Sequence, residues 1–134
     1  MKLDELRFDP IRHSYPQRRL FAFSGRNEPD VTFRCVEFLT GKVKWERNER
    51  WVPRSSPQPE VFGRGSAIMA DGKLIVLGEG GLLGLFKPNI EKPEEIARWQ
   101  VPQLHYTCWA APILSEKKIY LRSEDRLVCF NFAK

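Results

Sequence analysis

The sequence predicts an all-β fold made of short antiparallel strands grouped into three repeating units. Short apolar runs rich in Phe, Trp, Val, Ile and Leu alternate with turns, and ten prolines and nine glycines are spread between them. A strand–turn–strand pattern returns after 45 residues, as Ala67 and Pro112 begin two similar segments. The chain has 134 residues, of which 42% are hydrophobic, so we expect one folded unit with a core of its own.

Charge and cysteine usage narrow the functional classes. The net charge is +5, but the basic residues are scattered beside turns and on alternate strand positions, which is typical of solvated side chains and argues against a nucleic-acid role. Three cysteines cannot all pair within one chain, and none forms a CxxC motif or another metal-ligand spacing. The sequence therefore predicts neither a disulfide framework nor a metal site based on cysteine. The first ten residues lack the apolar core of an export signal, and no run of about 18 apolar residues predicts a membrane span.

The first unit is predicted from a hairpin near residue 40. We expect strands at 20–24, 33–37 and 43–46, because apolar residues alternate there with the period of two that a pleated strand requires. Thr40-Gly41-Lys42 interrupts this alternation and predicts the tight turn of a hairpin. Glycine accepts a positive φ at such a turn, and the threonine hydroxyl can accept a hydrogen bond from a nearby backbone amide.

The second and third units are predicted by superposing the sequence on itself. With a shift of 45 residues, 67–78 lies over 112–123, and each segment reads as strand, turn, strand. The same shift places 82–86 over 127–131, which predicts a third strand at the same distance in both units. A fourth strand is expected at 97–100 in the second unit, and the third unit has no counterpart to it.

Two columns of the repeat carry residues that we interpret as structural. Cys35, Gly84 and Cys129 align in the third strand of each unit, and we expect the two cysteines to be small core residues. Trp45 and Trp99 are 54 residues apart in the fourth strands, and we expect each ring to pack on the adjacent unit.

Units of four short antiparallel strands repeating every 45 to 54 residues are typical of β-propeller blades. An immunoglobulin-like sandwich would explain the strands but not the repeat. We therefore predict a single propeller segment over residues 1–134, with blades at about 11–51, 63–102 and 106–134, the last one lacking its outer strand. The stretches 52–62 and 87–95 are interpreted as loops. Three blades would form an open arc with exposed strand edges, so the segment requires further blades or self-association.

The hairpin also resembles the tryptophan-docking motif of PQQ-like, quinoprotein-type propellers, a family that includes outer-membrane-assembly-factor-like proteins. The usual form of that motif is Ala-x-Asp-x-x-Thr-Gly-Lys-x-x-Trp. The matching residues are Thr40, Gly41, Lys42 and Trp45, with Cys35 in place of Ala and Glu37 in place of Asp. In the second unit only Trp99 corresponds to the motif, and the resemblance covers about residues 20–132. The motif concerns packing between blades, so it favours a fold and not an activity.

The resemblance implies two functions. The first is a non-enzymatic scaffold or protein-binding surface without cofactor that forms part of a larger propeller, with further blades, a protein partner or self-association supplying the missing contacts. The alternative is a fragment of a quinone-dependent oxidoreductase whose PQQ and calcium ligands lie outside this chain. Full-length family members usually carry seven or eight blades and an export signal, which implies the bacterial periplasm or cell envelope for a longer parent protein.

Residues that could hold a metal or cofactor are few. Asn27, Glu28 and Asp30 lie in one predicted loop and offer oxygen ligands for a hard cation, although Asn and Asp are also the usual residues of turns. His105 and Cys108 are two ligands from one short loop, too few for zinc, so we interpret Cys108 as a buried apolar residue. No nucleophile elbow or phosphate-binding glycine loop is found, and no catalytic residue is predicted.

Overall fold

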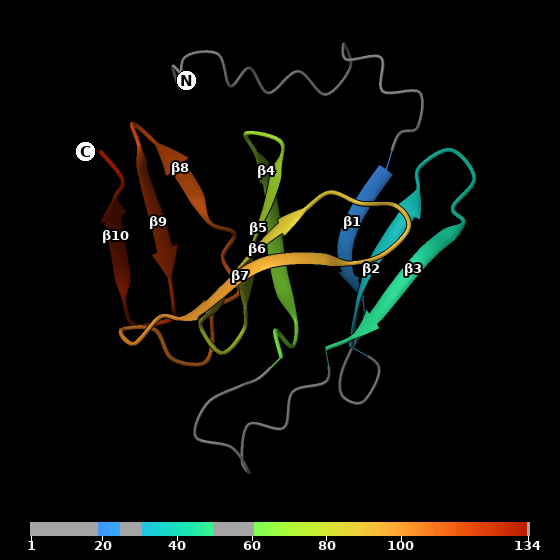
Figure 1. Ribbon diagram of the computed structural model, residues 1–134. Coiled ribbons are helices and arrows are strands. Elements are labelled where there is room, and N and C mark those ends of the chain that lie inside the picture. Colours follow the sequence, from blue (N-terminus) through green and yellow to red (C-terminus); the bar gives the residue numbers. More distant parts are fainter. Residues whose placement is uncertain (1–18, 25–30, 50–60, 134) are drawn as a thin grey trace.

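The computed structural model describes residues 19–24, 31–49 and 61–133, and all regular secondary structure in these ranges is β-strand (Figure 1). The strands form three antiparallel sheets, which follow one another along the chain. Their bounds are β1 Arg19–Ser24, β2 Thr32–Glu37, β3 Val43–Asn48, β4 Gly65–Ala70, β5 Lys73–Gly78, β6 Leu82–Lys87, β7 Glu94–Gln100, β8 Ile113–Ser115, β9 Lys118–Arg122 and β10 Leu127–Asn131. The expectation of an all-β fold is confirmed for the described residues.

The first sheet has the strand order β1-β2-β3, in which each strand pairs with the next along the chain. Cys35 pairs with Phe21 on one side and with Trp45 on the other. The turn between β2 and β3 contains Gly41 with φ of +71°, as the sequence predicts. A further, innermost strand of this unit would fall within residues 11–18, which lie outside the described residues.

The second sheet is complete, with four strands in the order β4-β5-β6-β7. The β4–β5 hairpin turns through Asp71 and Gly72, both of which have positive φ, 47° and 65°. The fourth strand is longer than expected because it begins at Glu94 and not near Ala97, so the loop that precedes it covers only residues 88–93.

The third sheet has three strands in the order β10-β9-β8, so β10 lies at one edge. In the part of the chain that the structure describes, no fourth strand pairs with β10, in agreement with the sequence. The β8–β9 turn contains Glu116 and Lys117 with φ of 49° and 62°.

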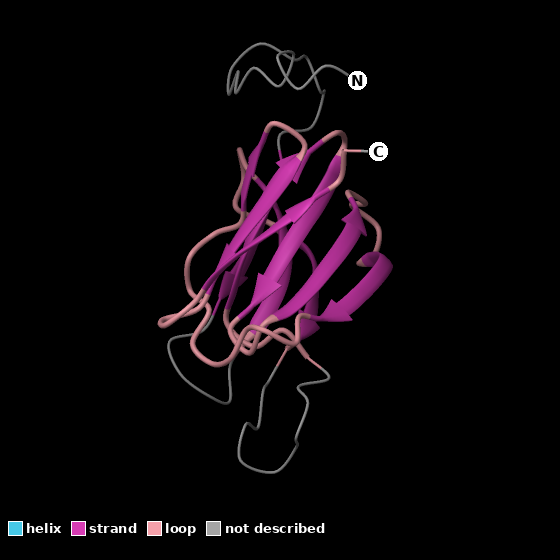
Figure 2. Ribbon diagram, turned by 90° about the vertical axis from the view of Figure 1, so that its left-hand side faces the viewer, coloured by secondary structure: helices cyan, strands magenta, loops and turns pink. Residues whose placement is uncertain are grey.

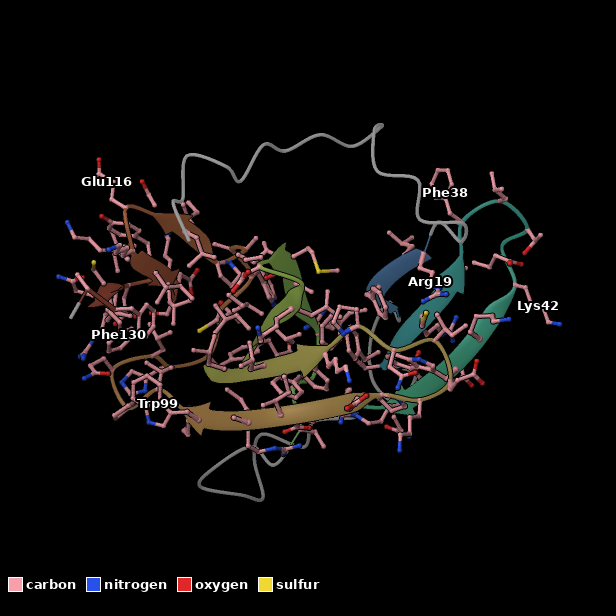
Figure 3. The ribbon with its side chains drawn as sticks, turned by 45° about the horizontal axis from the view of Figure 1, so that its top comes forward. Arg19, Phe38, Lys42, Trp99, Glu116 and Phe130 are labelled. Atoms are coloured by element: carbon pink, nitrogen blue, oxygen red, sulfur yellow. The ribbon has the colours of Figure 1, made fainter. Side chains whose placement is uncertain are left out.

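The three sheets stand side by side, with the second sheet between the other two (Figures 1 and 3). Viewed from the side, their strands run with similar tilts (Figure 2). Each junction contains one apolar cluster. The cluster between the first and second sheets contains Phe33, Phe62, Leu74, Val76, Leu82 and Phe86. The cluster between the second and third sheets contains Leu77, Val101, Leu104, Cys108, Ile119 and Leu121.

The strand pairing corrects the cysteine column that the sequence predicts. Cys35 pairs with Phe21, Leu85 with Ile75, and Cys129 with Tyr120, so Leu85 and not Gly84 occupies the position of the two cysteines. The cause is a difference in loop length: five residues separate the paired Leu77 and Leu83, whereas four separate Arg122 and Leu127. A shift of one residue moves a side chain to the other face of a sheet.

The register gives Cys35 and Cys129 the same position in their sheets, but the two residues differ in burial. Cys35 is fully buried and faces the second sheet, as expected of a core residue. Cys129 is exposed, which contradicts the interpretation as a core residue. Its neighbours Val128 and Phe130 pack toward the second sheet, so Cys129 lies on the opposite, outer face of the third sheet.

Candidate functional site

The β2–β3 turn owes its shape to hydrogen bonds among the residues of the predicted motif. The Thr40 hydroxyl donates to Glu37 Oε2 at 2.5 Å and accepts from the Lys42 backbone N–H at 3.2 Å. The Gly41 N–H donates to the Glu37 carbonyl at 2.9 Å, and the Glu37 N–H donates to the Lys42 carbonyl at 2.8 Å. Because Thr40, Gly41 and Lys42 are exposed, their arrangement fixes a turn and does not form a pocket.

Trp45 connects the first sheet to the second. Its indole Nε1–H donates to the backbone carbonyl of Asn89, in the loop between β6 and β7, at 2.7 Å. Its ring lies 5.4 Å from Phe33 in an edge-to-face contact and 6.0 Å from Phe21. Asn89 is itself held in place, because its side-chain amide donates to Glu94 Oε2 at 2.9 Å. Trp45 therefore joins the aromatic side of its own sheet to a fixed loop of the next one.

An arginine crosses the same junction. Arg47 on β3 forms ion pairs with the buried Glu49 and, at 2.9 Å, with Glu95 on β7. Its guanidinium also lies over the rings of Phe62 and Phe86, 5.7 and 5.0 Å from their centroids. The expectation that Arg47 is a solvated surface residue is therefore wrong, since its side chain is only 25% exposed. The pairing lets a charged residue lie in an apolar junction.

The same arrangement changes the pKa of Glu95. Burial acts to raise the pKa of Glu95, but hydrogen bonds from Arg98 and Arg47 outweigh it, and the pKa is lowered overall. Arg98 binds the same carboxylate from its own strand, with 2.7 Å between Arg98 Nη2 and Glu95 Oε2. The ionised carboxylate thus receives donors from both sheets.

Trp99 on β7 connects the second sheet to the third. Its ring meets Phe130 on β10 edge to face, with centroids 5.1 Å apart (Figure 3). Trp99 pairs with Leu83, whereas Trp45 pairs with Cys35. Because Leu85 corresponds to Cys35 and pairs with Ala97, Trp99 lies two residues beyond the position that corresponds to Trp45. Trp45 and Trp99 are therefore not strict equivalents, although each faces the sheet that follows.

The buried carboxylate of Glu79 accepts hydrogen bonds from two other segments of the chain at the second junction. Glu79 is 3% exposed and accepts from the Arg64 backbone N–H at 3.0 Å, from Arg64 Nε at 3.1 Å and from Trp109 Nε1 at 3.4 Å. The Arg64 guanidinium lies 5.4 Å from the centroid of the Trp109 ring. Gly63, with φ of +64°, is required here because a Cβ would meet the Glu79 carboxylate at 2.5 Å.

A hollow of about 330 Å³ opens beside this carboxylate. It is lined by Arg64, Gly65 and Trp109. Trp109 is 62% exposed, but its ring edge and one face are fixed by Glu79 and Arg64. The hollow therefore presents an ordered indole ring, an arrangement suited to contact with a partner.

The predicted candidates for metal binding gain no support from their surroundings. Among the described residues, no group of three or more His, Cys, Asp and Glu side chains could hold a metal ion. Cys108 is buried in the second cluster and donates to the His105 carbonyl at 3.0 Å, and desolvation raises the pKa of its thiol to about 11. Such a thiol stays protonated at neutral pH. The three loop residues Asn27, Glu28 and Asp30 lie outside the described residues.

The outer face of the third sheet carries exposed apolar side chains beside polar ones such as Lys118 and Asn131. Ile113, Tyr120 and Cys129 form one cross-strand row on this face. Ile113 is 62% exposed, and Leu127, on the same face, is 68% exposed. The corresponding faces of the first and second sheets pack against the sheet that follows, whereas no sheet within residues 19–24, 31–49 and 61–133 packs against this face.

Sequence reasoning missed both buried carboxylates. Glu49 accepts the Phe62 N–H at 2.9 Å, and Glu79 accepts the Arg64 N–H, so each fixes the chain just before β4. A local signal exists for Glu79 only, because it stands between Gly78 and Gly80-Gly81, where a small-residue environment lets a loop approach closely.

In comparisons with known proteins, no family model matches the chain, and no curated protein sequence matches it significantly. The resemblance to PQQ-like propellers therefore stays a prediction from the residues quoted above. In the described ranges, no helix is long and apolar enough to cross a membrane.

Proposed function

We propose that this chain is a structural and protein-binding segment built on the plan of a β-propeller of the PQQ-like type. In this proposal the three sheets are consecutive blades, and the uncovered face of the third sheet receives further blades or a protein partner. The resemblance of the β2–β3 hairpin to the docking motif supports this proposal, together with the stacking of the sheets in chain order.

One observation carries the proposal. Each of the first two sheets carries, on its last strand, a tryptophan that contacts the following sheet: Trp45 reaches the Asn89 carbonyl, and Trp99 meets Phe130. Interlocking of neighbouring sheets through their outermost strands is what a blade-to-blade interface requires. Because the third sheet carries the same kind of outer face, the proposal expects a polypeptide to cover it.

A ligand-binding experiment tests whether a quinone site lies on this chain. The chain is dialysed against PQQ with Ca²⁺ and examined for the absorbance of bound quinone and for dye-linked oxidation of alcohols or sugars. The proposal predicts no saturable binding and no oxidation. Stoichiometric quinone binding would overturn it, because a cofactor site would then lie on the chain itself.

Molar mass in solution tests how the third sheet is covered. Light scattering over a range of concentrations gives a single monomer mass if the cover comes from blades or partners other than this chain. A discrete oligomer shows instead that copies of the chain cover one another. Both results fit a scaffold, whereas a monomer whose Leu127 side chain is protected from solvent would contradict the exposed face on which the proposal rests.

A further inference from the structure

We propose that the open edge of β10 is a strand-accepting site. It takes one antiparallel strand from a protein partner, with an aromatic residue near the C-terminal end of that strand and carboxylates near its N-terminal end. The inference rests on the proposed function and deepens it, since it names the class of partner and the atoms that bind it.

The backbone of β10 presents free hydrogen-bonding groups at this edge. The Arg126 carbonyl accepts from the Ser123 N–H, and the Phe132 N–H donates to the Lys117 carbonyl, so residues 126 and 132 direct their backbone groups toward β9. Backbone groups alternate in direction along an antiparallel strand. The N–H and C=O groups of Leu127, Cys129 and Asn131 therefore point away from β9, and no strand in the described ranges pairs with them.

The other two sheets show what belongs at this edge. Cys35 on β2 and Leu85 on β6 correspond to Cys129 by their strand pairing. On β2, the Glu37 N–H donates to the Lys42 carbonyl. Glu37 lies two residues from Cys35, so the backbone groups of both residues point to the same side of the strand. At β6, the Gly81 carbonyl accepts from the Val101 N–H. Gly81 lies four residues before Leu85, so the backbone groups of both residues point to the same side. The groups that are open on β10 thus bind β3 and β7 in the other sheets.

Side-chain exposure indicates the aromatic residue of the partner strand. Leu83, which corresponds to Leu127, pairs with Trp99, and Cys35, which corresponds to Cys129, pairs with Trp45. Leu127 is 68% exposed and Cys129 is exposed, whereas Cys35 is fully buried. An aromatic residue opposite either position would cover both, because aromatic side chains reach diagonal neighbours across a sheet.

Charge indicates the carboxylates at the other end of the partner strand. In the second sheet, Lys87 on β6 lies 3.7 Å from Glu94 on the paired strand β7. Asn131 occupies the position of Lys87 in the third sheet, and it pairs with Lys118, which follows Lys117. An antiparallel strand whose aromatic residue lies beside Leu127 has its N-terminal end beside these two lysines, where carboxylates are favoured.

A peptide with the sequence of residues 93–101 is the appropriate probe, because it carries two glutamates before its tryptophan. The peptide, with blocked termini and a fluorescent label, is titrated with the full chain and with two variants, Cys129→Ala and Cys129→Pro. Proline removes the outward N–H, which β9 does not use, and edge strands tolerate proline. A scrambled peptide and one with Trp replaced by Ala serve as controls.

The proposal predicts saturable binding of the probe to the wild type and to Cys129→Ala, and affinity at least about tenfold lower for Cys129→Pro, with unchanged circular dichroism. Equal binding to both variants, or binding of the scrambled peptide, overturns the proposal. Amide hydrogen exchange gives an independent readout: Leu127, Cys129 and Asn131 should exchange rapidly in the chain alone and slowly with the peptide. Protection in the chain alone would show an occupied edge and also overturn the proposal, while leaving the docking of the three sheets untouched.

Discussion

Replacement of Trp45 by alanine tests the junction between the first two sheets. Trp45 is half-buried, contacts Phe33 and Phe21, and donates its indole N–H to the Asn89 carbonyl at 2.7 Å. The substitution removes these contacts and opens a cavity beside the first apolar cluster. We expect the folded state to lose stability.

The magnitude follows from the two parts of the interaction. Truncating a large buried aromatic residue to alanine costs about 3 to 5 kcal/mol, and the partial exposure of Trp45 places it near the lower value, about 3 kcal/mol. About 1 kcal/mol of this belongs to the hydrogen bond with Asn89, so Trp45→Phe should lose about 1 to 2 kcal/mol. The difference between the two variants separates ring packing from hydrogen bonding.

Urea denaturation followed by circular dichroism measures these free energies of unfolding. Phe38→Ala is the matched control, because Phe38 lies at the tip of the same hairpin and is 60% exposed, and we expect a change within about 0.5 kcal/mol. If Trp45→Ala unfolds at the same urea concentration as the wild type with an unchanged slope, Trp45 is not docked and the junction described here is wrong.

Three further predictions concern a glycine, the cysteines and acid stability. Gly84→Ala should destabilise by about 2 kcal/mol, because the added Cβ would lie 2.4 Å from a buried phenyl ring; an unchanged melting temperature would refute this packing. A thiol reagent should label Cys129 rapidly, and Cys35 and Cys108 only after unfolding, since burial raises the pKa of both buried thiols. Mass spectrometry should show one label on the folded protein, and rapid addition of three labels would contradict this burial. The lowered pKa of Glu95 means that its contribution to stability is present above pH 4.5 and is lost as the pH falls through the folded-state value, so Glu95→Gln should flatten the acid loss seen in pH-dependent denaturation.

The strands were predictable because their signals are local. Alternation of apolar residues located β2, the Thr-Gly-Lys sequence located the turn that follows it, and the 45-residue repeat placed β5 and β6. These features depend on neighbours along the chain, which the sequence displays directly.

The relation between the sheets was less accessible. An ungapped repeat assumes connections of equal length, but five residues separate the paired Leu77 and Leu83 whereas four separate Arg122 and Leu127, so Leu85 and not Gly84 corresponds to Cys129. Cys129 is exposed although it corresponds to the buried Cys35, because no sheet in the described ranges follows the third one. The length of a loop does not reveal which residues pair across it.

The ion pairs of the junctions could not be predicted for a different reason. Arg47 and Glu95 are 48 residues apart, and nothing in either local pattern distinguishes an arginine that crosses a junction from one that faces solvent. The flanking glycines permit a close approach to Glu79, but they do not identify Arg64 and Trp109, which reach it from two other segments. Long-range charge pairing is a property of the packed sheets.

The most direct test of the account is the nuclear Overhauser spectrum of the aromatic protons. The central claim is that the outer strand of each of the first two sheets places a tryptophan against the next sheet. We predict cross-peaks between the rings of Trp99 and Phe130, and between the indole N–H of Trp45 and protons of Asn89 and its neighbours in the loop before β7. Absence of both sets of cross-peaks, in a folded sample with all four indole N–H signals resolved, would contradict the stacking of the three sheets.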